Sequence, residues 1–328
     1  MKPLVSVLTI IIGTLFSNSQ FAGAATVSLS SSCKSAGAKY VIMMQGGSLS
    51  RPKSSGTVEY AKKLEKPIRS ILKKGEEALD KGATALEVVA YVVSEMEDSG
   101  VLNAGRGAKP NTAGEKELDA SIMDGKTQKA GAVASVRNIK NPILGALYIM
   151  EETENVLFVG PSADRLLNDA GLETASLADG REFANDNVGM DNSEPVGTVG
   201  AVVLDKCGNL AAGTSTGGFK TKTPGRVGDS PISGAGTYAN ETVAISATGH
   251  GEYFIRYSVA HDIYARMAYG GKSLEDAASA VISELESKGG KGGVIAIDKD
   301  GNYSMPYSYP AMIRGIAGAG IDLDVRSY

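Results

Sequence analysis

Five short glycine-rich segments lie between residues 197 and 252, and they carry threonine, arginine and aspartate among their glycines. The segments are Gly197–Gly200, Gly213–Gly218, Gly225–Pro231, Gly234–Gly236 and Thr248–Glu252. Glycine allows a backbone amide to come close to a small ligand, because it has no side chain in the way. This stretch therefore predicts a binding site for a small molecule.

Arg226 and Asp229 place opposite charges three residues apart in the third of these segments. A guanidinium group can bind a carboxylate through two parallel hydrogen bonds, and a carboxylate can hold an ammonium group. Together the two side chains would recognise the α-carboxylate and the α-amino group of an amino acid. A structural ion pair between them is the alternative.

Thr198 is the candidate nucleophile. The chain has only two histidines, His250 and His261, so acid–base chemistry needs another group. The α-amine of a new N-terminus has an unperturbed pKa of about 7.7–8.0. Cleavage between Gly197 and Thr198 would place that amine beside the threonine hydroxyl, so that one residue supplies both nucleophile and base. Taken alone, Thr198 would be an ordinary strand residue.

Several familiar sites do not fit the chain. Neither a His-x-x-x-His nor a Cys-x-x-Cys spacing occurs, which argues against zinc. No P-loop is present, and a Ser-His-Asp triad would have to use one of the two histidines. Residues 234–239 loosely match a dinucleotide-binding loop, but they precede a strand-like segment instead of opening a helix.

The composition suits a globular protein with one large domain or two ordinary ones. The chain has 328 residues, of which 42% are hydrophobic, and a formal net charge of −4. This weak negative charge gives no broad attraction to nucleic acid or to anionic lipid, and we expect neither as a partner. No later segment is long and apolar enough to span a bilayer, so we expect no membrane contact after processing.

Residues 1–24 differ from the rest of the chain. Lys2 precedes an apolar run over residues 4–16, and Ala22-Gly23-Ala24 follows it. This pattern is typical of a signal peptide and predicts a protein exported to the periplasm or secreted. An uncleaved membrane anchor is the alternative.

Only two cysteines are present, Cys33 and Cys207. An oxidising compartment would allow a disulfide between them, but sequence does not establish that they lie close together. The paired and unpaired states both remain open. Lipid attachment to Cys33 is not expected, because the residue lies well beyond the apolar run.

The first half of the chain predicts strands mixed with helices. We expect a buried strand at 40–44, ended by Gly46 and Gly47. A helix begins at Thr84, which forms a capping box with Glu87. The other predicted segments are a flexible start (25–38), a helix (58–81), a loop (100–118), a strand (130–136), a helix (141–152) and a mobile linker (178–197).

The second half predicts two hairpins separated by two helices. The hairpins pair 198–205 with 210–216 and 294–298 with 303–307; the helices cover 252–269 and the segment that starts at Ser273 and is stopped by Gly289. Helices, hairpins and helices in this order favour stacked sheets with helical cover.

Together these motifs resemble the isoaspartyl peptidase/L-asparaginase family, the plant-type asparaginases among the N-terminal nucleophile hydrolases. The first half carries Asn103-Ala104-Gly105, Leu118-Asp119-Ala120, Met123-Asp124-Gly125 and Lys129–Val133, and the second half matches from Thr198 to Met305-Pro306. The resemblance implies an α+β fold, a four-layer αββα sandwich. It also implies one folded domain that splits into an α subunit (25–197) and a β subunit (198–328), with a homodimer of αβ units.

The resemblance also implies roles for individual residues. Thr198 would be the nucleophile, Thr216 would support it and Asn103 would help to position it. Thr248 and Gly249 would line the oxyanion hole. The residues implied to bind substrate are Arg226, Val227, Gly228, Asp229, Thr248, Gly249, His250 and Gly251. We expect no catalytic part for His250.

No organic cofactor is implied, but the family holds a structural sodium ion through backbone carbonyls in the loop before Asn-Ala-Gly. The carbonyls at the corresponding positions belong to Met96, Glu97, Ser99, Leu102, Ala104 and Arg106.

The implied activity is removal of β-linked L-aspartate from isoaspartyl peptides, together with L-asparaginase activity. Two alternatives stay open. A glycosylasparaginase would usually carry Ser-Thr-Asn-Gly at residues 215–218, where this chain has Ser-Thr-Gly-Gly. An uncleaved, inactive homologue that only binds amino acids draws its support from Gln45, which stands where the family usually has histidine. The departure after Pro306, at residues 307–310, is expected to reshape the pocket rim.

Overall fold

The computed structural model describes residues 27–35, 38–49, 53–175, 197–219 and 222–328. The predicted signal peptide at 1–24 and the predicted linker up to residue 196 lie outside the described residues. None of the helices in the described part is long and apolar enough to cross a membrane.

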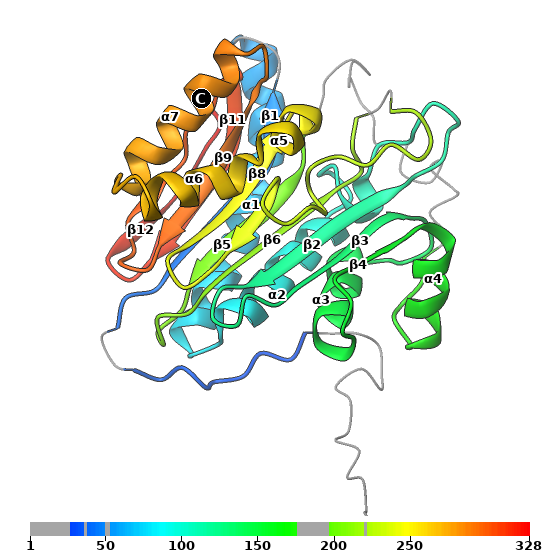
Figure 1. Ribbon diagram of the computed structural model, residues 1–328, viewed down its shortest axis with the longest axis horizontal. Helices are drawn as coiled ribbons and strands as arrows, with labels where there is room; N and C mark the ends of the chain where they lie inside the picture. Colours follow the sequence, from blue (N-terminus) through cyan, green and yellow to red (C-terminus); the bar gives the residue numbers. More distant parts are fainter. Residues whose placement is uncertain (1–26, 36–37, 50–52, 176–196, 220–221) are drawn as a thin grey trace, which may run out of the picture.

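Helices and strands alternate along the described chain (Figure 1). The strands are β1 (Val41–Leu49), β2 (Leu118–Asp124), β3 (Ala130–Val136), β4 (Leu157–Val159), β5 (Val199–Leu204), β6 (Leu210–Thr216), β7 (Thr237–Ala239), β8 (Val243–Gly249), β9 (Gly292–Asp298), β10 (Tyr303–Ser304), β11 (Ala311–Gly318) and β12 (Ile321–Arg326). The helices are α1 (Ser55–Asp80), α2 (Ala85–Asp98), η1 (Gly105–Gly107), α3 (Pro142–Glu152), α4 (Gly160–Asp169), α5 (Gly251–Tyr257), α6 (Val259–Ala268) and α7 (Leu274–Ser287).

The strands form two sheets. The larger has the order β12-β11-β1-β5-β6-β2-β3-β4, and the smaller has the order β10-β9-β8-β7. Neighbouring strands are antiparallel, apart from β3 and β4, which are parallel. The large sheet contains strands from both halves of the chain. β5 and β6, from the second half, lie between β1 and β2, from the first half.

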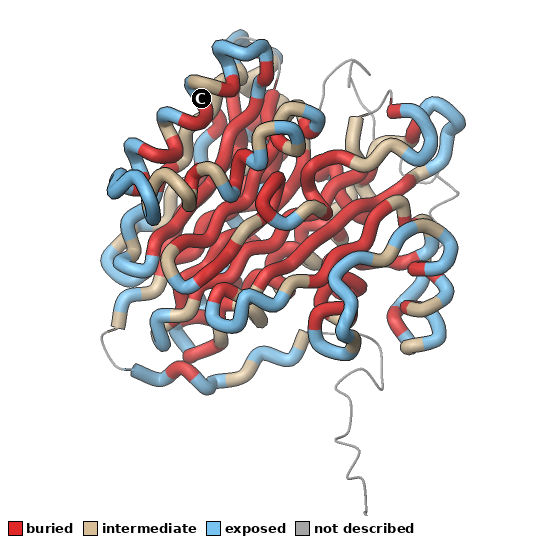
Figure 2. The backbone as a smooth tube through the Cα atoms, viewed as in Figure 1, coloured by how far each residue is buried: buried red, intermediate tan, exposed pale blue. Residues whose placement is uncertain are grey.

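Side-chain alternation along the strands divides the core into three clusters. On one face of the large sheet, Ile42 and Met44 pack with α1, α2 and α3. On its other face, Val41 and Met43 pack with residues of the small sheet such as Ile295. The far face of the small sheet packs with α5, α6 and α7. Because both faces of these strands are covered, the strands are buried almost throughout (Figure 2). The protein is thus a mixed α/β molecule with stacked sheets.

Local signals set several element ends as predicted. The side chain of Thr84 accepts a hydrogen bond from the Glu87 N–H, and the Glu87 carboxylate accepts one from the Thr84 N–H, which confirms the capping box of α2. Ser273 caps α7 in the same position. Gly289 follows α7 with φ +88°, a conformation that favours glycine. The hairpin of β5 and β6 is also confirmed.

Gly46 and Gly47 do not end the first strand, which corrects the prediction. β1 continues to Leu49 because a bulge between Gln45 and Gly47 absorbs the glycines while pairing with β11 continues. The prediction of one helix over 252–269 is also wrong. Ser258 has φ +47° there, so the chain forms α5 and α6 as separate helices.

Three further segments differ from expectation. Only residues 303–304 of the predicted strand at 303–307 form a strand, β10. Strands β11 and β12 complete one edge of the large sheet without having been predicted. The predicted flexible start is held in part by Cys33, which is 2% exposed and forms a disulfide with Cys207.

Candidate active site

Thr198 directly precedes β5, a central strand of the large sheet, and is buried. Its hydroxyl donates a 3.1 Å hydrogen bond to Oγ1 of Thr216, the last residue of the neighbouring strand β6. Thr216 Oγ1 also accepts a 2.9 Å hydrogen bond from the Gly218 N–H. Because the Thr198 hydroxyl points its proton toward Thr216, the lone pairs of the Thr198 oxygen stay available to attack a carbonyl carbon.

Asn103 positions the turn that follows β6. Its Nδ2 donates to the Gly218 carbonyl at 2.8 Å, and its own carbonyl accepts from the Gly217 N–H at 3.0 Å. Because Gly218 in turn donates to Thr216, Asn103 acts on the nucleophile through this turn.

The two charged residues predicted to bind an amino acid line the same pocket as Thr198. They do not form the ion pair that was the alternative: Arg226 Nε donates to Glu252 Oε1 at 2.9 Å, and Nη2 lies 2.9 Å from the same oxygen. The guanidinium also stacks on Phe219, 4.6 Å from the ring centroid. Sequence reasoning missed Glu252 as a partner, although it ends one of the glycine-rich segments.

Asp229 is the buried negative group of the pocket. Its Oδ2 has no hydrogen-bond partner among the described residues. Burial raises the pKa of this carboxyl to about 7, because the charged form loses solvation there. An ammonium group from a ligand would supply the missing donor and favour the ionised form.

Gly251 leaves space where these charged groups converge. A Cβ at this position would stand 2.8 Å from both Arg226 Nη2 and Asp229 Oδ1. A Cβ at Gly228 would stand 2.8 Å from Arg226 Nη1. A side chain at either position would therefore displace the Arg226 guanidinium from where it lies. Val227 lies half-buried in the same turn.

Gly197 lies against the end of β8 and the glycine loop of β1. A Cβ on Gly197 would stand 2.6 Å from Thr248 Oγ1 and 2.8 Å from the Ser48 N–H nitrogen. The hydroxyls of Thr248 and Ser48 are both buried without a partner among the described residues, so two donors are free in the pocket that Gly197 and Thr198 line. Gly249 has φ +152°, and a Cβ there would stand 2.4 Å from the Lys291 carbonyl.

Gln45 holds the glycine loop in place. Its Nε2 donates to the Ala247 carbonyl at 3.3 Å, and its Oε1 accepts from the Gly47 N–H at 2.9 Å. Gly47 has φ +99°, and a Cβ there would stand 2.5 Å from the Gly197 nitrogen. Gln45 thus connects β1 to β8 directly beside the Gly197–Thr198 bond.

Three aromatic rings gather at one wall of the pocket. The ring of His250 lies edge-on to Phe219 and to Tyr309, with centroid distances of 6.1 and 6.0 Å. Phe219 and Tyr309 themselves line the pocket. Burial raises the pKa of Tyr309 to about 12. His250 contributes to this wall by packing. Tyr309 belongs to the segment 307–310 that was expected to reshape the pocket rim, whereas Phe219 was not singled out from sequence.

The predicted sodium loop runs from the end of α2 through η1. Its carbonyls are hard oxygen donors of the kind that alkali and alkaline-earth cations take. The Arg106 carbonyl, however, accepts a 2.7 Å hydrogen bond from the Lys116 ammonium, whose charge would oppose a cation on that oxygen. Arg106 therefore does not fit the predicted ligand set, whereas the carbonyls of Met96, Glu97, Ser99, Leu102 and Ala104 are not opposed in this way.

The side chain of Glu97 lies in the core, although its carbonyl belongs to the predicted sodium loop. It is fully buried, and its Oε1 accepts hydrogen bonds from Ser215 Oγ at 2.6 Å and the Ile143 N–H at 3.0 Å. Burial raises its pKa to about 8, which favours the neutral acid. This contact fixes β6 one residue before Thr216.

Comparison with known proteins agrees with this geometry. A family model described as asparaginase matches residues 38–186 and 175–324. An isoaspartyl peptidase of Salmonella typhimurium is 42% identical over 301 residues, covering 86% of this chain and 96% of the relative. An isoaspartyl peptidase of Escherichia coli is also 42% identical, covering 86% of this chain and 94% of its own length. A probable isoaspartyl peptidase/L-asparaginase of Arabidopsis thaliana is 34% identical, covering 73% and 84%.

Proposed function

The chain belongs to the asparaginase family, and from this we propose that it is a self-cleaving threonine hydrolase that removes β-linked L-aspartate from isoaspartyl peptides and also hydrolyses L-asparagine. One observation carries the proposal. The Thr198 hydroxyl lies directly after Gly197, in the same pocket as Arg226 and the unpartnered Oδ2 of Asp229. A nucleophile and the groups that would bind an α-amino acid therefore line the same pocket.

Self-cleavage comes first. The Thr198 hydroxyl attacks the Gly197 carbonyl carbon, the peptide C–N bond breaks, and an ester joins Gly197 to the Thr198 oxygen. Breaking the C–N bond frees the Thr198 α-amine, and water then hydrolyses the ester, which releases the Thr198 hydroxyl and separates the two chains. The free hydroxyls of Thr248 and Ser48 supply donors for the oxyanion, each of the kind that contributes roughly 3–4 kcal/mol to barrier lowering where measured.

In turnover, Arg226 binds the α-carboxylate of the aspartyl unit and Asp229 binds its α-ammonium. The Thr198 hydroxyl attacks the side-chain carbonyl, and its own amine accepts the proton and passes it to the leaving amine. Thr248 and Gly249 stabilise the oxyanion. Water then releases aspartate from the acyl-enzyme.

The mature protein would be one folded domain made of residues 25–197 and 198–328. The three apolar clusters support a four-layer αββα sandwich of the N-terminal nucleophile type. A homodimer of such αβ units, export after removal of residues 1–24, and a structural sodium ion held without the Arg106 carbonyl belong to the same proposal. A bound ion would stabilise the loop before Asn103, and no step of the reaction needs it.

Assays with matched substrates test the activity. The purified protein should release aspartate from β-aspartyl-leucine and from L-asparagine, because both present the aspartyl group that Arg226 and Asp229 recognise. Faster cleavage of an asparagine-linked sugar than of either would instead identify a glycosylasparaginase. Release from none of the three would favour the inactive binding homologue.

Replacement of Gln45 by alanine should slow self-cleavage about tenfold, the equivalent of about 1.4 kcal/mol. The change removes the hydrogen bonds that hold the Gly47 loop beside Gly197. The rate is followed by the conversion of freshly made precursor on a reducing denaturing gel. Gln45→His is the matched control, since histidine keeps a donor and an acceptor and should restore the rate. Unchanged cleavage in Gln45→Ala would show that the loop needs no such support.

Replacement of Tyr309 by alanine should lower kcat/KM for β-aspartyl-leucine about tenfold more than for L-asparagine. The aromatic wall offers apolar surface to the residue that leaves, and asparagine has no such residue. Tyr309→Phe keeps the ring and should behave like the wild type. Equal losses for both substrates would mean that Tyr309 does not contact the leaving residue.

A further inference from the structure

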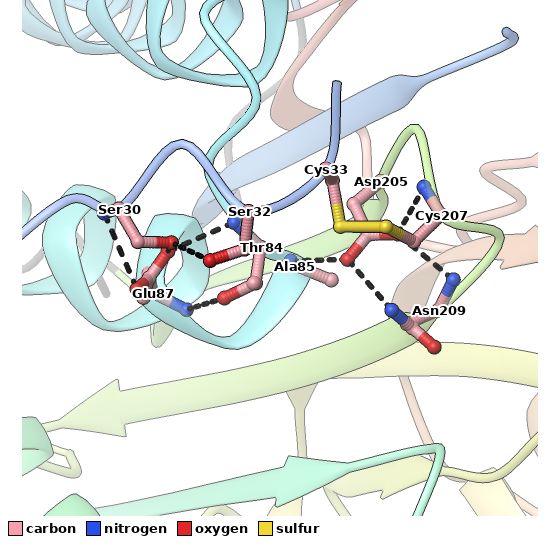
Figure 3. Close-up of a disulfide and its surroundings, with 9 residues drawn as sticks. All are labelled: Ser30, Ser32, Cys33, Thr84, Ala85, Glu87, Asp205, Cys207 and Asn209. Carbon is pink, nitrogen blue, oxygen red and sulfur yellow. Dashed lines mark hydrogen bonds between the residues drawn. A yellow bond between two sulfur atoms is a disulfide. The ribbon is translucent and has the colours of Figure 1, made fainter. Parts of the chain in front are cut away.

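The Cys33–Cys207 disulfide crosses the proposed cleavage point. Cys33 precedes β1, and Cys207 lies in the turn between β5 and β6, 174 residues later, with 5.2 Å between the Cα atoms (Figure 3). The Gly197–Thr198 bond lies between them in sequence. Building on the proposed self-cleavage, we infer that the mature enzyme is a covalent two-chain protein whose α and β subunits stay joined through Cys33 and Cys207.

The turn that carries Cys207 is fixed independently of the sulfur bond. Asp205 Oδ1 accepts hydrogen bonds from the N–H groups of Cys207 and Asn209, both at 2.9 Å. Asp205 Oδ2 accepts from the Ala85 N–H at 2.9 Å and from Asn209 Nδ2 at 3.1 Å. One carboxylate therefore ties the turn of the β subunit to the start of α2 in the α subunit (Figure 3).

The segment that carries Cys33 is held from the other side. The Cys33 N–H donates to the Gly82 carbonyl at 2.9 Å. Gly82 has φ +95°, and a Cβ there would stand 2.7 Å from the Cys33 carbonyl, so the two segments pack in direct contact. Ser30 Oγ donates to Glu87 Oε2 at 2.9 Å, which anchors the same segment to α2. Both cysteines are thus placed for pairing by contacts of their own.

A metal ion fits this place less well than a disulfide. Cys33, Asp205 and Cys207 form the group of potential metal ligands found among the described residues. The sulfurs are bonded to each other, however, and both Asp205 oxygens already accept two hydrogen bonds each. A metal would need free thiolates and free carboxylate lone pairs.

The bond forms by thiol–disulfide exchange with an oxidised dithiol of the compartment or with a small disulfide such as oxidised glutathione. One cysteine thiolate attacks the donor disulfide and releases one donor thiol, which gives a mixed disulfide. The second cysteine thiolate then attacks the protein sulfur of that mixed disulfide and releases the other donor thiol. The two cysteines lose two electrons, and the donor disulfide gains them. The bond persists in an oxidising compartment, in agreement with proposed export.

Intact mass of the full-length purified protein, alkylated under denaturing conditions and measured with and without reductant, tests the inference. We expect one unalkylated species without reductant and two chains with it, the smaller beginning at Thr198. The joined species should be lighter by two hydrogen atoms than the two reduced chains together. Two chains without reductant would overturn the inference while leaving the proposed cleavage intact. Alkylation of both cysteines without reductant, together with stoichiometric zinc in the native protein, would overturn it in favour of a metal site.

The Thr198→Ala variant separates failure of the tether from failure of cleavage. It stays uncut, so its cysteines report on the disulfide alone. One outcome is that the cysteines of this variant resist alkylation while the wild type also runs as one chain under reduction. That outcome would refute self-cleavage and with it the two-chain enzyme. Alkylated cysteines in the same variant would refute the disulfide itself.

A functional measurement follows from the tether. Cys33→Ser should match the wild type in native activity, because Cys33 lies outside the catalytic pocket. After denaturation without reductant and hundredfold dilution, the variant should recover several-fold less activity than the wild type, since its chains must find each other again. Reductant should remove the difference. Equal recovery without reductant would count against the tether.

Discussion

We expect Thr198→Ala to leave one uncut chain without measurable hydrolase activity. The change removes the candidate nucleophile that directly follows Gly197, and an uncut chain has no free amine at residue 198. Loss of a nucleophile of this kind costs on the order of 10⁴-fold or more in kcat. Because the buried side chain differs by a hydroxyl and a methyl group, the fold should persist, and the thermal midpoint checks that it does.

Two measurements follow the variant. Mass under reducing denaturing conditions reports cleavage, and release of aspartate from β-aspartyl-leucine reports turnover. Thr198→Ser is the matched control, because it keeps a hydroxyl at the same position and should cleave itself and turn over more slowly than the wild type. Aspartate released by Thr198→Ala would show that another residue is the nucleophile.

Arg226→Ala should lower kcat/KM for β-aspartyl-leucine by roughly 10²-fold, chiefly through a higher KM. The guanidinium is held in the pocket by Glu252 and by stacking on Phe219. In its absence the substrate carboxylate would lose a bidentate partner and meet the negative charges of Glu252 and Asp229 instead. Steady-state kinetics at several substrate concentrations separate KM from kcat.

The assignment of Arg226 to the α-carboxylate has its own control. 3-Aminopropanamide is L-asparagine without that carboxylate, so the wild type should hydrolyse it poorly and Arg226→Ala should lose little further. Arg226→Lys keeps the charge but lacks the fork and should fall between the two. If Arg226→Ala lost as much activity on 3-aminopropanamide as on β-aspartyl-leucine, Arg226 would contact some other part of the substrate.

Local sequence determined much of the framework around this site. The capping box of Thr84 and Glu87, the cap at Ser273 and the hairpin that follows Thr198 all depend on residues a few positions apart. Such signals act within one turn or one strand pair, so they survive in any tertiary context. Arg226 and Asp229 likewise lie in one pocket and only three residues apart in one loop.

Tertiary packing determined the features that these local signals did not predict. The bulge beyond Gln45 depends on β11, and the break at Ser258 interrupts a pattern that would otherwise have continued as one helix. Glu252 became the partner of Arg226, and Tyr309 became a wall of the pocket, only because distant loops meet there.

The disulfide shows the difference most clearly. Two cysteines 174 residues apart carry no signal of proximity in sequence. Their pairing follows from β5 lying beside β1, which brings the turn after β5 to the segment before β1. Local sequence therefore identified Thr198 as the candidate nucleophile, whereas its neighbours and the Cys33–Cys207 link arise from strand order in the sheet.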